Sequence, residues 1–139
     1  MQSYLEITGY GFRRKLCENV SSWFIEKYMP RHHLWIQICH RGLKRENVVG
    51  WCDVSGKTYR PRDFLIEIQT YLPEELYIKT LIHELIHVRQ WVFENLRERR
   101  GKMYWNSNEI LNMADTNEPH EAEAYGQEDI LYSEYMRSS

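Results

Sequence analysis

The sequence from residue 81 reads Leu81-Ile-His-Glu-Leu-Ile-His-Val-Arg-Gln90, and this stretch decides the fold. Pro73, followed by two glutamates, opens a helix in the usual way, because proline tolerates the first helical turn and acidic side chains complement the positive helix end. No helix breaker follows between Leu76 and about Glu98. The middle of this segment is apolar on nearly all sides. We therefore predict a long, central and buried helix here.

The same stretch carries a metal-binding pattern, His-Glu-x-x-His. His83 and His87 lie one turn apart on one helix face, so both imidazoles can reach the same cation, and neutral imidazole is a preferred zinc ligand. Glu84 lies beside them, where it can accept a proton from a metal-activated water. The alternative is an exposed helix with two solvent-facing histidines. The Leu, Ile and Val neighbours disfavour it.

A catalytic zinc site needs a third protein ligand, and the last predicted helix, Pro119 to about Met136, offers several carboxylates. At about 100° per residue, Glu121 falls in the middle of the apolar face that must turn inward. Glu123 falls about 200° away and is expected to be solvated. Glu128 shares the buried face and could orient a ligand histidine. Periodicity thus favours Glu121 as the third ligand.

Other residues compete for roles at this site. His120, at the start of the last helix, is a rival ligand or a helix-terminal polar residue, and Glu109 is a further candidate that nothing positions. A peptide oxyanion would need a donor opposite the metal. Tyr125, Tyr132 and His120 are candidates, and Tyr125 is the one we select because it lies one turn from Glu121. A buried structural tyrosine is the alternative for each ring.

The rest of the chain is expected to form a single domain over residues 1–139 of α+β class, since no repeat or linker divides it. Residues 99–118 are predicted to be an irregular polar connection that could gate the site. Residues 64–69 are our candidate for the sheet edge that would pair with an extended substrate. The other predicted elements are a helix over 11–29 and strands over 34–39, 48–53 and 64–69.

A family resemblance rests on two blocks. His83 to His87, followed by Glu121-x-x-Ala124 on a helix, resembles the gluzincin arrangement, in which two histidines and a glutamate bind zinc. Residues 81–90, together with Pro119-x-Glu-x-Glu-Ala-Tyr-Gly-x-Glu128, are similar to small zincin-like proteins of tailed bacteriophages. The blocks cover about a quarter of the chain, and the N-terminal 70 residues add only the order helix, strands, active-site helix. Arg89 departs from the pattern, which usually has an apolar residue there. The resemblance implies a minimal zincin-like metallopeptidase domain with Zn²⁺ held by His83, His87 and Glu121.

Composition narrows the setting. The three cysteines have no paired spacing and read as free thiols in a reducing compartment, and neither a signal peptide nor a membrane span is apparent. A cytoplasmic protein, in the host cytoplasm if phage-encoded, is expected. Residues 1–62 carry 11 Lys and Arg against 5 Asp and Glu, whereas residues 63–139 carry 7 against 15. The basic half could meet nucleic acid, or its cations could be scattered over solvated faces.

The pattern predicts a zinc-dependent peptidase with a peptide or protein substrate. A rival of another class is a catalytically silent zincin-like module that binds protein or nucleic acid and keeps a structural metal. Retention of Glu84 favours the enzyme, because a structural metal needs no base. An amidase-like hydrolase acting on a small amide is a narrower alternative.

Overall fold

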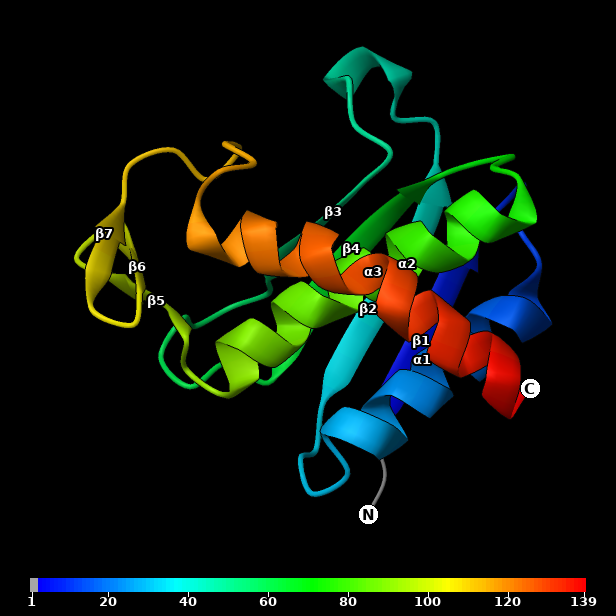
Figure 1. The fold of residues 1–139 in the computed structure, drawn as a ribbon, viewed down its shortest axis with the longest axis horizontal. Coiled ribbons are helices and arrows are strands. Elements are labelled where there is room, and N and C mark those ends of the chain that lie inside the picture. The colour runs from blue at the N-terminus through cyan, green and yellow to red at the C-terminus, as the bar shows by residue number, and fades with distance from the viewer. Residues whose placement is uncertain (1–2) are drawn as a thin grey trace.

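The computed structural model describes residues 3–139 and has the predicted α+β class (Figure 1). Within this range a four-stranded sheet, three α-helices and a smaller three-stranded sheet are formed. The elements are β1 (Tyr4–Gly9), α1 (Arg14–Tyr28), β2 (Trp35–Arg41), the 3₁₀ turn η1 (Lys44–Glu46), β3 (Gly50–Val54), β4 (Asp63–Gln69), α2 (Glu74–Val92), β5 (Leu96–Arg99), β6 (Lys102–Trp105), β7 (Asn108–Ile110) and α3 (Pro119–Ser138).

The larger sheet has the strand order β1-β2-β4-β3. Strands β1, β2 and β4 are parallel, and β3 runs antiparallel to β4, with Gly50 opposite Ile68 and Val54 opposite Phe64. The prediction that residues 64–69 form an edge is therefore wrong. Strand β4 has neighbours on both sides, which suits its nearly continuous apolar start at Phe64. The edge beside the long helix is β3. Strand β1 was not predicted.

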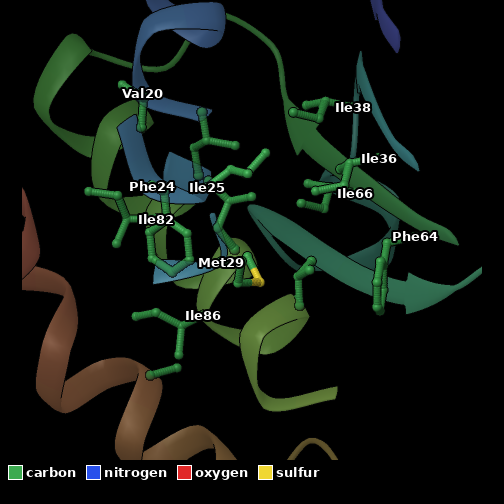
Figure 2. Close-up of a cluster of buried hydrophobic side chains, with 14 of the residues drawn as sticks. Val20, Phe24, Ile25, Met29, Ile36, Ile38, Phe64, Ile66, Ile82 and Ile86 are labelled. Carbon is green, nitrogen blue, oxygen red and sulfur yellow. The ribbon is translucent and has the colours of Figure 1, made fainter. Parts of the chain in front are cut away.

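The core lies between this sheet and the helices that cover one of its faces. Alternate residues of β2 and β4 point into it, and α1 and α2 supply the opposing side chains (Figure 2). Each large aliphatic or aromatic side chain buried in this way contributes about 1.5–3 kcal/mol. The labelled members of this cluster are Val20, Phe24, Ile25, Met29, Ile36, Ile38, Phe64, Ile66, Ile82 and Ile86.

Helix α2 is the central helix that the sequence predicts, and nearly all of its residues from Tyr77 onward are buried. It lies between the sheet and α3, which crosses it on the side away from the sheet (Figure 1). Arg89 fits this position without being apolar. Its guanidinium donates to Gln127 Oε1 at 2.6 Å and lies 4.9 Å from the ring centre of Tyr28, so it ties α2 to both other helices.

The predicted extension of α2 to Glu98 is wrong, because the helix ends at Val92. Glu94 takes a left-handed backbone conformation (φ 65°), and Leu96 then enters the core with 1% of its surface exposed. The chain continues as the small sheet β5-β6-β7, where the sequence predicts an irregular connection. Two tight turns close it, and both central residues of each, Arg100-Gly101 and Asn106-Ser107, have positive φ.

A second polar cluster is buried near the N-terminal end of α2. His40 on β2 is fully buried, donates from Nδ1 to Thr8 O at 2.9 Å and accepts at Nε2 from the Tyr77 hydroxyl at 2.8 Å. Its ring stacks on Phe12, with the centres 3.5 Å apart. Burial lowers the pKa of His40 below its ordinary value, although the bond to Thr8 opposes this.

Candidate metal centre

Three side chains predicted as metal ligands converge between α2 and α3. Glu121 Oε1 lies 3.0 Å from His83 Nε2 and 3.1 Å from His87 Nε2. One ligand atom from each residue lies within 4.8 Å of the other two, so this group could hold a metal ion. The two histidines come from successive turns of α2, and the carboxylate comes from the first turn of α3.

The far nitrogen of each histidine also has a partner. His83 Nδ1 donates to Glu128 Oε2 at 2.8 Å, and His87 Nδ1 donates to Gln90 Oε1 at 2.8 Å. An acceptor at Nδ1 fixes the proton there in the neutral imidazole and leaves the Nε2 lone pair for a cation. The two orienting contacts therefore fit a metal bound through both Nε2 atoms. Glu128 lies where the sequence predicts an orienting group.

Gln90 was not predicted for this role. It is 1% exposed, and its amide nitrogen donates to His120 O and to Glu123 Oε1, both at 2.9 Å. Glu123 is therefore half-buried and hydrogen-bonded, and the expectation that it is solvated is wrong. Helical angles place Glu123 away from Glu121, but they do not show that Gln90 reaches across from α2. A glutamine one turn after the predicted ligand His87 is the only sequence signal for this contact.

The charges of the cluster shift one another's titration. Burial would lower the pKa of His83, but the hydrogen bond to Glu121 and the charge of Glu84 raise it to about 9. Burial would raise the pKa of Glu121, but hydrogen bonds from His83 and His87 hold it well below its usual range. Burial raises the pKa of Glu84 to about 7, against the lowering effect of both histidines. These pKa shifts show that the cluster favours a positive charge between the two imidazoles and the Glu121 carboxylate.

The cluster opens into a cavity of about 900 Å³ that Glu84 and the edge strand β3 also line. Strand β3 approaches α2 closely at Gly50. A Cβ at this position would lie 2.9 Å from Thr80 Cγ2 and 3.3 Å from Glu84 Oε2. Glycine therefore lets the strand backbone pass beside Glu84 without crowding it. The cavity brings together the Glu84 carboxylate, a three-residue group that could hold a metal ion, and the edge strand β3.

The remaining candidates are placed differently. Tyr125 lines the cavity, and its ring centre lies 4.5 Å from that of His83; burial raises its pKa. His120 lines it too, but its Nε2 donates to Met113 O at 2.9 Å and it is not part of the three-residue group. Tyr132 and Glu109 are not among the cavity-lining residues, and Glu109 is exposed on β7.

The comparisons with known proteins add no assignment. No protein-family model matches this chain, and neither the curated proteins nor the solved structures gave a match. Across residues 3–139, no helix has both the length and the apolar character needed to cross a bilayer. The arrangement of the buried side chains is therefore the basis for any functional conclusion.

Proposed function

We propose that this chain is a zinc-dependent peptidase of the zincin type, with His83, His87 and Glu121 as the ligands. The observation that carries the proposal is the convergence of both Nε2 atoms on one Glu121 oxygen, with Glu84 beside them in an open cavity. Two imidazoles and one carboxylate, with a position left for water, form a donor set typical of catalytic zinc. Bound zinc would supply Lewis acidity and lower the pKa of water to about 7.

The chain's own groups then have separate tasks. Glu84 accepts a proton from the attacking water and delivers it to the leaving amine, as a general base and then a general acid. Glu128 and Gln90 keep the two imidazoles oriented. Tyr125 is our candidate donor to the developing oxyanion, because its ring packs against His83 within the same cavity.

We further propose that the substrate backbone pairs with β3. This strand is the edge of the larger sheet opposite β1, it lines the cavity from Gly50 to Cys52, and Val48 and Val49 just before it are exposed. An extended peptide that adds to an edge strand gains main-chain hydrogen bonds irrespective of its side chains. Such pairing would bring a peptide bond beside Glu84. It favours a peptide over a small amide as the substrate.

The test compares the wild type with Glu84→Gln on a broad peptide library, with and without chelator. We expect about one zinc per chain in both proteins, because Glu84 is not a ligand. We expect hydrolysis by the wild type only, and its loss when chelator is added. Glu98→Gln is the matched control, because Glu98 is exposed on the small sheet; it should behave as wild type.

Two results would count against the proposal. If the wild type and Glu84→Gln retain zinc and are equally inactive on every peptide, the chain is a metal-stabilised binding module. If neither protein retains zinc after refolding with excess metal, the ligand assignment fails as well.

A further inference from the structure

The small sheet β5-β6-β7 has one inward and one outward face. Its inward residues belong to or pack against the hydrophobic core, and they are Leu96, Met103, Trp105 and Ile110. The register pairs Arg97 with Tyr104 and Arg99 with Lys102, and Tyr104 with Glu109 on the far strand. Directly paired residues share a face, and successive residues alternate. The outward face therefore carries Arg97, Arg99 and Lys102 on β5 and β6 beside Tyr104, and Glu109 of β7 lies on the other side of this ring.

These cations are unusual for their part of the chain. Residues 63–139 contain 7 Lys and Arg against 15 Asp and Glu, yet four of the seven lie between residues 97 and 102. The fourth is Arg100, in the turn at the tip. All four are exposed, and none forms an ion pair with any side chain in the described range 3–139. The side chains are thus free to meet an anionic partner.

The sheet stands at one end of the molecule, beyond the C-terminal end of α2 (Figure 1, yellow). A second exposed group adjoins its base. Arg60 lies 4.0 Å from Glu94, just before β5, and its guanidinium packs 5.4 Å from the ring centre of Tyr59, which is 70% exposed. Both segments at this end therefore carry a tyrosine ring next to at least one cation.

We propose that the outward face of β5 and β6 binds a single-stranded nucleic acid, with phosphates on Arg97, Arg99 and Lys102 and a base stacked on Tyr104. The inference is independent of the peptidase proposal. Residues two apart on a strand are about 6.6 Å apart, a spacing comparable to that between neighbouring phosphates. A stacking ring among cations is the arrangement used to bind single strands without sequence preference.

The ring distinguishes this partner from an acidic polypeptide. Carboxylates would use the cations alone and would gain little from Tyr104. A duplex keeps its bases stacked inside, so it too would contact only the cations. Tyr104 is half-buried on the face that carries the three cations, so a base that stacks on its ring would bring its phosphates close to them. Dependence of binding on this ring is therefore the decisive measurement.

The experiment measures fluorescence anisotropy of a labelled mixed-sequence oligonucleotide, single-stranded and as a duplex, with zinc-loaded protein at several salt concentrations. The triple variant Arg97→Gln/Arg99→Gln/Lys102→Gln should weaken single-strand binding about tenfold or more and reduce the salt slope by about 2. Tyr104→Leu should weaken it by about 5-fold to about 100-fold, whereas Tyr104→Phe should bind as wild type.

The control removes equal charge from other exposed positions, in the variant Lys15→Gln/Arg45→Gln/Arg137→Gln. It should bind as wild type, and circular dichroism should show every variant folded. Equal losses of single-strand affinity in the control and in the Arg97→Gln/Arg99→Gln/Lys102→Gln variant would overturn the proposal. Equal affinity of the wild type for the duplex and the single strand would also overturn it. Competition by polyglutamate with no effect of Tyr104→Leu would assign the face to an acidic polypeptide instead.

Discussion

Helix α2 contributes to two buried polar clusters that differ in how their atoms are satisfied. Near its N-terminal end, His40 donates to Thr8 O and accepts from Tyr77, so each imidazole nitrogen has a complementary partner. Further along, Nε2 of His83 and of His87 both face one oxygen of Glu121. A single proton can serve only part of that arrangement, whereas a cation can accept lone pairs from all three residues.

The two clusters show which features separate a structural buried histidine from one that could bind a metal ion. Burial alone does not do so, since His40 is more buried than either His83 or His87. The informative feature is which atoms converge, and whether the cluster opens to a cavity. The cluster of His83, His87 and Glu121 lines the cavity, while His40 and Tyr77 do not. Substitutions in the His40 cluster should therefore change the free energy of unfolding. Substitutions in the second cluster should change the amount of metal that the protein retains.

The largest expected effect is on the zinc content of the protein when the cluster of His83, His87 and Glu121 is changed. Glu121→Ala removes the oxygen that both Nε2 atoms face, so zinc content after dialysis should fall from about one per chain to nearly none. Glu109→Ala is the control, because that carboxylate is exposed on β7 and is not part of the three-residue group. Metal analysis by mass spectrometry checks both variants. If Glu121→Ala and Glu109→Ala retain equal metal, Glu121 is not a ligand.

A smaller effect on zinc affinity is expected when the hydrogen-bond partners of the two histidines are replaced. Gln90→Leu removes the acceptor for His87 Nδ1, and Glu128→Leu removes that for His83 Nδ1. Loss of such an orienting partner should weaken zinc affinity by about 10- to 100-fold in each case. Glu128→Gln keeps an oxygen acceptor and should lose less. Competition with a chromophoric chelator gives the affinities. A Glu128→Gln variant as weak as Glu128→Leu would show that charge, not orientation, accounts for the contact.

The sequence predicted the metal side of this comparison better than the structural side. His83, His87 and Glu121 were predicted from helical periodicity. A spacing of four residues places the two histidines on one face of a helix, and Glu121 lies on the apolar face of another. The contact of Gln90 with Glu123 depends on the distance between two helices, and periodicity within one helix does not give this distance. His40 was not singled out, because its partners Thr8 and Tyr77 come from other elements.

The sheets show the same division. The segment after Val92 contains good helix formers, so local propensity predicts that α2 continues. In the structure, the burial of Leu96 and the Arg100-Gly101 turn make this segment part of the small sheet instead. The strands over 34–39, 48–53 and 64–69 were predicted, but their order in the sheet was not. Strand order depends on pairing with β3, whose apolar pattern is weak.

The smallest expected effect is the pH dependence of the stability that His40 contributes. Burial holds the pKa of His40 below the ordinary 6.5, so the unfolded chain takes up a proton at this residue before the folded chain does. Its contribution to stability is therefore complete above about pH 6.5 and is lost as the pH falls below it, by at most about 1.4 kcal/mol per pH unit.

His40→Leu should be less stable than the wild type at neutral pH by about 2–4 kcal/mol, because Thr8 O and the Tyr77 hydroxyl lose their partner. Since the variant lacks the titrating imidazole, the difference in the free energy of unfolding should narrow as the pH falls from 7 toward 5. Denaturant titrations with excess zinc at each pH measure it, and titrations common to both proteins cancel. Zinc content at pH 7 should be unchanged. A constant difference across this range would contradict the lowered pKa of His40. A loss of zinc from His40→Leu would mean that the two clusters on α2 are not separate.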